Sequence, residues 1–357
     1  MLYNYIEESA YSAIVMQEDN GSMPPGHNGP YYDPETPVRN TSHWLITFLK
    51  AYKITGDKKY LDAALRASNY LCSKEARPMG AAFWHRKNPQ KDFCNGLIGQ
   101  AWTIEALVEA AVVLEKPELS HLAEEVFLMH PFDWNAGVWQ RVAVDGMHLT
   151  IDGTFNHQLW FAAAGGLLAP YSKETELRVQ RFLNRLHKLI HLYSNGLIRH
   201  SLFVNRNLEQ KAKNLFSFAK GFLINRKPLI HKAIGYHQFN LYALAMLKQF
   251  DPDHSFWQSN KFEKLWNYAN SDQYKQAIKN NQFGYPYNPP GFEMAFALAV
   301  FKDESDQEQQ EWLAEQFQRC FDFKTNLMTL DTKDPMTQAA RLYEVTRMPD
   351  LDIEIII

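Results

Sequence analysis

The segment IDGTFNHQLW, residues 151–160, holds the side chains best suited to proton chemistry. Asp152 precedes an apolar helical pattern, and Asn156 follows four residues later, which places both on one face of a helix. Asn156, His157 and Trp160 fall in its first two turns, where polar groups must be satisfied internally or face a cavity. Because histidine titrates near neutral pH, His157 could be a general acid or base; a satisfied core histidine is the alternative.

A second cluster, YHQFN at residues 236–240, begins another apolar helical pattern. The Tyr236 hydroxyl could pass a proton, and His237 could assist it. The two clusters together indicate an acid–base site that is assembled from distant parts of the chain.

The loop 17–40 is rich in Gly and Pro and ends where the next helical pattern begins. Four residues that could bind a ligand gather there: Arg39, Asn40, His43 and Trp44. The Arg39 guanidinium could clamp a carboxylate through two hydrogen bonds. An ion pair between Arg39 and an acidic residue of its own loop, Asp33 or Glu35, is the alternative.

Further candidates precede or begin two other apolar helical patterns. Asp92, Gln100 and Trp102 stand near residue 96, where Asp92 could be an acid or simply an acidic group near a helix start. Tyr285 and Tyr287 lie in FGYPYNPPGFE. Their rings could stack on the apolar face of a sugar or pack against the neighbouring prolines.

Composition excludes several classes of protein. The net charge of -3 does not suit a nucleic-acid binder. The sequence has no HExxH, HxH, GxGxxG or Walker motif, so we expect no metal and no nucleotide cofactor. No run approaches 18 apolar residues, and the N-terminus has no basic stretch before an apolar one. We therefore expect no membrane span, no secretory signal and a cytoplasmic location. The oligomeric state stays open.

Helical periodicity dominates the chain and predicts an all-α fold. Twelve helices are expected, at about 3–16, 41–54, 57–73, 96–115, 117–129, 153–169, 174–193, 235–249, 259–279, 291–302, 306–321 and 335–347. Those starting near 41, 96, 153, 235, 291 and 335 include segments that are apolar nearly all round, which indicates burial on all sides. The others are amphipathic. Six helical hairpins of this kind can close into an (α/α)6 toroid, with an open solenoid as the competing arrangement.

Closure of the ring would gather the starts of all inner helices at one end. The long loops lead into the inner helices, so residues 1–350 are predicted to form one toroid domain with a funnel at this end. Helix N-termini around a funnel favour anionic ligands. The apolar tail 351–357 could join a sheet edge, pack on the body or be ordered by a partner.

Three segments carry a resemblance to six-hairpin carbohydrate-active enzymes: HWLITFLKAYKITGDKKYLDAALRASNYL, NGLIGQAWTIEALVEAA and GLIRHSLF. The chain resembles unsaturated glucuronyl and rhamnogalacturonyl hydrolases, N-acylglucosamine 2-epimerases, toroidal polysaccharide lyases and the C-terminal domain of glucuronyl C5-epimerases. It is also similar to proteins of bacterial and archaeal glycan-assembly clusters, one of which has been proposed to isomerise a hexuronate. The resemblance implies a toroid that binds carbohydrate.

Within IDGTFNHQLWFAAA, the resemblance points to two reactions. The segment is similar to the helix that carries an acidic aspartate in the unsaturated-glycoside hydrolases, which implies that role for Asp152. The pair Asn156 and His157 is closer to uronate lyases, where Asn neutralises the carboxylate and His or Tyr removes the adjacent proton.

The leading hypothesis is an epimerase or lyase that acts on a uronic-acid-containing glycan or glycan intermediate by removing the proton next to the carboxylate. Arg39 and Asn156 would bind the carboxylate, and His157 would move protons with Tyr236 or His237. The alternatives are a glycoside hydrolase that uses Asp152 and Asp92, and a glycan-binding or scaffold protein without activity.

Overall fold

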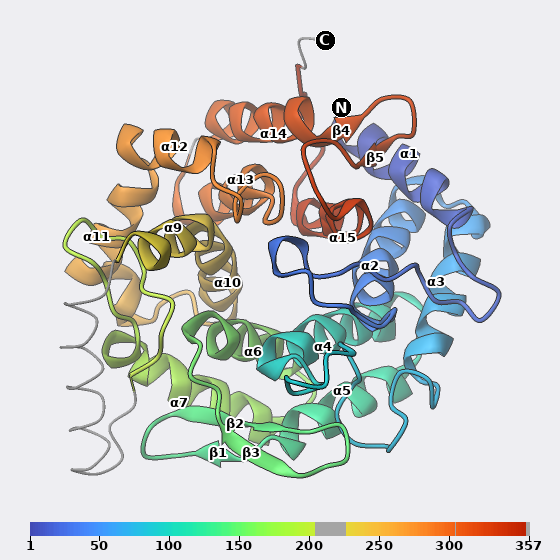
Figure 1. Cartoon of the computed structure of the whole chain (residues 1–357), viewed down its shortest axis with the longest axis horizontal. Coiled ribbons are helices and arrows are strands. Elements are labelled where there is room, and N and C mark those ends of the chain that lie inside the picture. The colour runs from blue at the N-terminus through green and yellow to red at the C-terminus, as the bar shows by residue number, and fades with distance from the viewer. Residues whose placement is uncertain (204–225, 304, 355–357) are drawn as a thin grey trace.

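The computed structural model describes residues 1–203, 226–303 and 305–354, and within them the helices form a closed double ring (Figure 1). The inner ring consists of α2 (Val38–Thr55), α4 (Gly96–Val113), α6 (Phe155–Leu168), α10 (His237–Phe250), α13 (Pro290–Phe301), and α15 (Pro335–Ala340) continued by the 3-10 helix η3 (Arg341–Arg347). Each inner element packs against the next, and η3 returns to α2. This closure confirms the predicted (α/α)6 toroid.

The outer layer holds the amphipathic helices: α1 (Leu2–Ile14), α3 (Lys58–Leu71), α5 (Pro117–Met129), α7 (Lys173–Leu189), α11 (Asn260–Ala269), α12 (Asp272–Lys279) and α14 (Asp306–Cys320). Two predicted helices differ from the structure. The segment 259–279 is two helices, because Ser271 caps a new start by accepting a hydrogen bond from the Tyr274 N–H. The last inner helix continues as a 3-10 helix from Arg341.

Helix α4 shows why the inner helices are apolar all round. It is long and apolar enough to cross a membrane, yet 78% of it is buried inside the protein. It lies between α2 and α6 and is covered on the outside by α5. Packing in the ring therefore accounts for its composition.

Short elements occupy the connections between helices. β1 (Phe132–Asp133), β2 (Val138–Val142) and β3 (His148–Ile151) form an antiparallel sheet in the order β1-β2-β3, with Phe132 opposite Trp139 and Gln140 opposite Ile151. β4 (Phe321–Asp322) pairs with β5 (Leu327–Met328). The short helices are η1 (Gly29–Tyr31), α9 (Lys227–Gly235) and η2 (Ser255–Gln258).

Buried glutamines near the starts of inner helices attach the incoming loops. Gln158 of α6 accepts a hydrogen bond from the Trp139 N–H and donates to the carbonyl oxygens of Trp139 and Asp152. In α4, Gln100 makes equivalent bonds to both backbone groups of Phe83 and to the Cys94 carbonyl. These bonds fix the loops that carry the funnel residues.

The tail packs on the body of the protein. The Leu2 N–H donates to the Leu351 carbonyl oxygen at 2.8 Å, and the Tyr3 N–H donates to the Asp350 carboxylate. The side chains of Leu351 and Ile353 are buried. Residues 355–357 lie outside the described part of the chain. The tail therefore joins the end of the ring to its first helix.

Candidate active site

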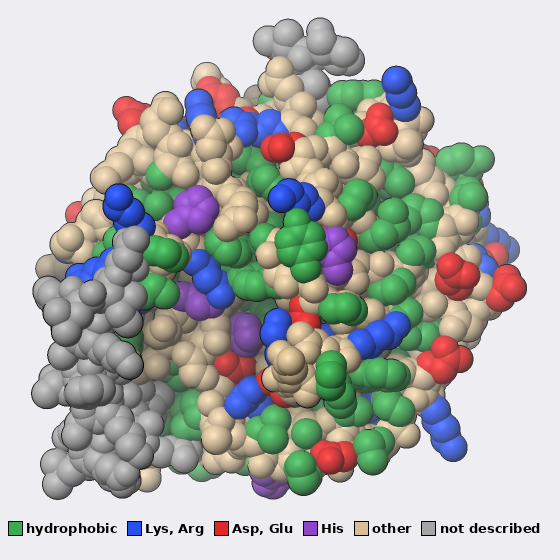
Figure 2. All heavy atoms as spheres, viewed as in Figure 1, with side chains coloured by type: hydrophobic (Ala, Val, Ile, Leu, Met, Phe, Trp, Pro, Cys, Tyr) green, Lys and Arg blue, Asp and Glu red, His purple; other side chains and the backbone are tan. Residues whose placement is uncertain are grey.

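A cavity of about 180 Å³ opens at the end of the ring where the inner helices begin, and Figure 2 shows a hollow near the centre of this face. Its lining comes from the loops before α2, α4, α6 and α13, from the segment after α7 that holds His200, from inner helices, and from α9. The lining residues are Asn28, Tyr31, Arg86, Lys91, Asn95, Ile98, Trp102, Thr154, Asn156, His157, His200, Lys232, Tyr236, Phe239, Tyr287, Asn288 and Arg341. The cavity is large enough for a monosaccharide-sized group and is strongly polar.

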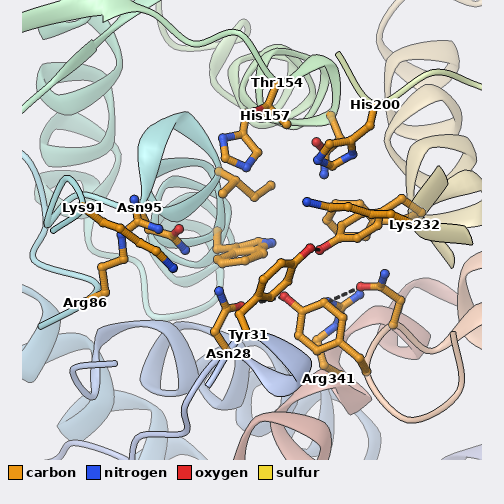
Figure 3. Close-up of a pocket in the computed structure, with 17 residues that line it drawn as sticks. Asn28, Tyr31, Arg86, Lys91, Asn95, Thr154, His157, His200, Lys232 and Arg341 are labelled. Carbon is orange, nitrogen blue, oxygen red and sulfur yellow. Dashed lines mark hydrogen bonds between the residues drawn. The ribbon is translucent and has the colours of Figure 1, made fainter. Parts of the chain in front are cut away.

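His157 is held in one orientation by Asp152. Its Nδ1 lies 2.8 Å from Asp152 Oδ2. A carboxylate can only accept, so Nδ1 carries the proton and Nε2 keeps a free lone pair. The ring lines the cavity and, as Figure 3 shows, points into it. This is the arrangement of a general base whose tautomer is fixed by a buried acid.

Asp152 is itself tied to two helix starts. Besides His157, it accepts hydrogen bonds from the backbone N–H groups of Leu97 and Thr154, both at 3.1 Å. Burial would raise the pKa of this carboxyl, but His157 and the two N–H groups outweigh it and hold the pKa well below its ordinary value. Asp152 therefore stays ionised and orients the ring.

Gly96 makes room for the pair. Its φ is +60°, and an added Cβ would lie 2.5 Å from Asp152 Oδ2 and 2.7 Å from His157 Nδ1. Only glycine satisfies both the backbone conformation and the space. The first residue of α4 is thus part of the geometry of the site.

His200 supplies a second imidazole. Residues 198–202 run beside the start of α6, where the Phe155 N–H donates to the His200 carbonyl oxygen. Burial, with the nearby Lys232 and His157, lowers the pKa of His200 well below its usual value. The ring is therefore neutral, its Nδ1 has no hydrogen-bond partner among the described residues, and it faces the cavity beside His157 (Figure 3).

Three tyrosines form another wall. The hydroxyls of Tyr31 and Tyr236 lie 2.8 Å apart, and the Tyr287 hydroxyl donates to Asn28 Oδ1 at 2.6 Å. Burial raises the pKa of Tyr31 and Tyr236 far above the ordinary value. These two phenols stay protonated, so they act as hydrogen-bond donors to a ligand rather than as bases.

The lining carries cations and, among the described residues, no carboxylate. Arg86, Lys91, Lys232 and Arg341 all line the cavity. Asn156 also lines the cavity, and its Oδ1 atom has no hydrogen-bond partner within the described part of the chain. Such a lining favours an anionic ligand that also offers hydroxyl groups.

Arg39 does not line the cavity. It is fully buried, and its Nη1 donates to Asn28 at 3.0 Å and to Glu35 at 3.3 Å. Its guanidinium also stacks on Trp102, 4.2 Å from the ring centroid. The ion pair with Glu35, which was the alternative reading of the sequence, is therefore the observed one. Arg39 supports the lining residue Trp102.

Other predicted ligand residues at helix starts lie in the packed core. Asn40 donates to the Pro24 carbonyl oxygen, and the His43 ring stacks on Tyr343 with centroids 4.1 Å apart. Trp44 packs on Phe48. These three side chains contact the preceding loop or neighbouring core residues. An inner helix is enclosed on all sides, so only some residues of its first turn face the funnel.

Trp160 and the candidates near residue 96 are also outside the lining. Trp160 donates to the Phe239 carbonyl oxygen at 3.1 Å and stacks on that ring. Asp92 pairs with Arg86 and Arg141 and accepts a hydrogen bond from the Gly96 N–H, so it serves a helix start. Gln100 fixes a loop, as described above.

His237 and Tyr285 are displaced from the cavity as well. His237 Nδ1 accepts a hydrogen bond from the Ile198 N–H, and its Nε2 donates to the Leu265 carbonyl oxygen on the outer side of the ring. Burial lowers its pKa to about 4. Tyr285 is buried under Arg319. His237 is thus a satisfied core histidine.

The predicted residues that line the cavity are His157, Tyr236, Asn156, Trp102 and Tyr287. The residues that sequence reasoning left out come mainly from the long loops: Asn28, Tyr31, Arg86, Lys91, His200 and Lys232. These loops have no periodicity that could tell a lining residue from its neighbours. One signal for a helix was available. The segment KPLIHKAIG has a proline near its start, as helices often do, and it forms α9, which carries Lys232.

Metal ligation finds no support in the described residues, which contain no group of three or more His, Cys, Asp or Glu side chains able to hold an ion.

Comparison with solved structures places the ring among known toroids. It superposes on D-mannose isomerase with a TM-score of 0.65, at 15% identity and with 97% of both chains covered. The TM-score is also 0.65 for cellobiose 2-epimerase from Bacillus thermoamylovorans, at 12% identity and with 97% of this chain and 98% of that chain covered. It is 0.61 for unsaturated glucuronyl hydrolase from a Bacillus species, at 12% identity and with 97% of this chain and 96% of that chain covered. At these identities the likeness shows the shared fold.

No family model matches the sequence. A full-length relative does: archaeal glycosylation protein Q of Haloferax volcanii is 47% identical over 365 residues, covering 99% of this chain and 98% of that protein. At this identity and coverage, the chain belongs to the family of archaeal glycosylation protein Q.

Proposed function

We propose that the protein is a carbohydrate enzyme that removes the proton next to the carboxylate of a hexuronate, giving epimerisation or elimination. The observation that carries the proposal is the pairing of His157 with Asp152 at the wall of a cavity lined by cations. The proposed base His157 and the cations that would stabilise the negatively charged intermediate line the same small cavity.

The reaction uses the lining as follows. His157 Nε2 takes the proton from C5, and the C–H electron pair moves into the C5–C6 bond, so charge accumulates on the carboxylate oxygens. Cationic side chains stabilise this charge. A proton delivered to the other face of C5 from the Tyr236–Tyr31 hydroxyl pair, which regains one from solvent, completes epimerisation. In elimination, the C5 electron pair forms the C4–C5 double bond, and the C4 oxygen substituent leaves with the C4–O electron pair and takes a proton from the same hydroxyl pair.

The names of similar proteins support a sugar substrate. The 47% identical relative is called a glycosylation protein, and solved toroids of the same fold include a sugar isomerase and a sugar 2-epimerase. Isomerases and 2-epimerases also remove a proton beside a carbonyl carbon, which is the class of chemistry that His157 is arranged to perform.

The geometry does not favour the hydrolase alternative. Glycoside hydrolysis ordinarily uses two carboxyl groups that flank the scissile bond, one of them protonated. Asp152 and Asp92 are both outside the lining, and each is held ionised: Asp152 by His157 and two N–H groups, Asp92 by two arginines and the Gly96 N–H. Neither is placed to protonate a leaving group.

The test is proton exchange in heavy water, followed by NMR on a panel of hexuronates, free and in oligosaccharides. Deuterium should enter at C5, with the C5 epimer or an unsaturated product appearing at a linked rate. His157→Ala should lower the exchange rate by about 10²- to 10⁴-fold. His121→Ala, an exposed histidine on α5, is the matched control and should leave the rate unchanged.

Two results would contradict the proposal. One is exchange that persists in His157→Ala at the wild-type rate. The other is calorimetric binding of uronates without exchange or turnover by the wild-type protein on any member of the panel. That second outcome would favour the non-catalytic glycan-binding alternative.

A further inference from the structure

The four cations of the cavity differ in how their charge is balanced. Arg341 forms buried ion pairs with Glu293 at 3.0 Å and Glu344 at 2.6 Å. Its guanidinium therefore already has two carboxylate partners.

Two other lining cations, Arg86 and Lys91, each have carboxylate partners. Arg86 pairs with Asp33 and Asp92, and Lys91 pairs with Asp33 at 3.0 Å. Lys232 has no carboxylate partner among the described residues. Of the four lining cations, it is therefore the one without a carboxylate partner in the described part of the chain.

Lys232 is held in place by the packing of α9. The Asn281 side chain donates to the His231 carbonyl oxygen at 2.7 Å, and the Tyr274 hydroxyl donates to the Ile234 carbonyl oxygen at 3.0 Å. These bonds fix the helix on both sides of Lys232. The lysine is thus presented to the cavity by a rigid element, and its position does not depend on a free loop.

The ammonium group lies over two aromatic rings at the centre of the site. Lys232 Nζ is 4.9 Å from the ring centroid of Tyr31 and 5.6 Å from that of Tyr236. Figure 3 shows it reaching into the cavity beside His200, on the side facing His157. Tyrosine faces stabilise the cation only partly, which leaves it able to bind an anion.

We propose that Lys232 binds the carboxylate of the substrate and decides between hexuronates and neutral hexoses. This inference rests on the proposed function, because it concerns the same cavity. The ammonium would form a charge-assisted hydrogen bond with a carboxylate. The CH₂OH group of a neutral hexose would leave a half-buried charge without its counterion.

The same contact would assist the proton transfer. As C5 loses its proton to His157, negative charge grows on the carboxylate oxygens, and the Lys232 ammonium gains interaction energy at that moment. Removing the ammonium should therefore lower both the affinity for uronates and the rate of exchange at C5. A merely structural role would not separate charged from neutral sugars.

The experiment compares glucuronate with glucose, galacturonate with galactose, and mannuronate with mannose. Binding is measured by calorimetry and exchange by NMR in heavy water, for the wild type, Lys232→Met, Lys232→Arg and the control Lys58→Met, an exposed lysine on α3. Lys232→Met should weaken uronate binding by about 10- to 100-fold and leave binding of the neutral partners within about threefold. Lys232→Arg should restore part of the uronate affinity, and Lys58→Met should match the wild type.

Each outcome decides the inference. Equal uronate affinity in Lys232→Met and the wild type overturns it, as does a parallel loss for charged and neutral sugars, or no uronate binding by the wild type. Thermal unfolding of each variant shows whether it is folded. If the wild type exchanges no proton but Lys232→Met still loses uronate binding selectively, the proposed reaction fails while the assignment of Lys232 stands.

Discussion

Replacing Asp152 by Asn should reverse the tautomer of His157 while leaving the shape of the site intact. Asp152 Oδ2 accepts from His157 Nδ1 at 2.8 Å and from the Leu97 N–H at 3.1 Å, and Oδ1 accepts from the Thr154 N–H. In the variant, the carboxamide oxygen can keep one backbone bond, and its NH₂ group faces His157 Nδ1. That nitrogen must then accept, so the proton moves to Nε2, the atom that faces the cavity.

The expected loss follows from the role of the base. With the proton on Nε2, the ring cannot accept one from substrate, which removes a contribution of about 10²- to 10⁴-fold. This corresponds to about 3–5 kcal/mol of transition-state stabilisation, at 1.36 kcal/mol per tenfold. The loss should appear in the exchange rate at saturation. Affinity for a uronate should change by about threefold or less, because Asp152 does not line the cavity.

The assay combines exchange in heavy water with ¹⁵N NMR of the histidine rings, which reports the tautomer directly. Asp322→Asn is the matched control, since Asp322 also accepts a backbone N–H bond but ends strand β4, on the outer side of the ring. An Asp152→Asn protein that exchanges at the wild-type rate, or whose His157 keeps its proton on Nδ1, would refute the reasoning.

Three further changes test the packing around the site. Gly96→Ala should lower the free energy of unfolding more than Gly56→Ala does, and it should also lower activity. Both glycines have a positive φ, which costs an alanine about 1–2 kcal/mol, but only Gly96 adjoins the Asp152–His157 pair. Equal losses of stability in urea unfolding would contradict this. Arg39→Met should lower the stability of the protein by about 3–5 kcal/mol, because it leaves Glu35 buried and unpaired. Adding Glu35→Gln to this variant should recover part of the lost stability. If it recovers none, the broken ion pair is not the cause of the loss. Burial lowers the pKa of His237 to about 4 from an ordinary 6.5, so the unfolded chain binds more protons between these pH values and stability falls as pH falls. The share of His237 in this loss is about 3 kcal/mol at pH 4. His237→Asn should make the slope of stability against pH less steep by that share in urea unfolding, and an unchanged slope would rule the assignment out.

The ring was predictable because its signal is repeated along the chain. Helix α4 is apolar all round and α7 is amphipathic, and this contrast recurs hairpin after hairpin. A closed ring buries the apolar helices on the inside and leaves the charged faces of the amphipathic helices on the outside, so it accounts for this alternation. Periodicity did not reveal every helix boundary. Ser271, for example, caps a new helix start by a local hydrogen bond and so divides one expected helix into two.

The site was predictable only where a polar residue interrupts an apolar helix. His157 and Asn156 stand out against α6, and both line the cavity. The same reasoning misplaced His43 and His237, because a polar residue in the first turn can equally face a neighbouring element. Which of these directions it takes depends on the rotation of the helix, which a single sequence does not reveal.

The loop residues could not be assigned for a different reason. Tyr31, His200 and Lys232 reach the cavity through turns, bridges and a short helix whose positions depend on the assembled ring. Their identity is visible in the sequence, but their convergence is a property of the fold. The expected cytoplasmic location stays a prediction.

The most direct measurement is a crystal structure of His157→Ala with a hexuronate bound. The account predicts that the sugar occupies the cavity at the starts of the inner helices, with its carboxylate on Lys232 and its C5–H bond pointing to the space vacated by the His157 ring. A hexuronate seated elsewhere, or one in this cavity with its carboxylate turned to solvent and C5 away from residue 157, would contradict it.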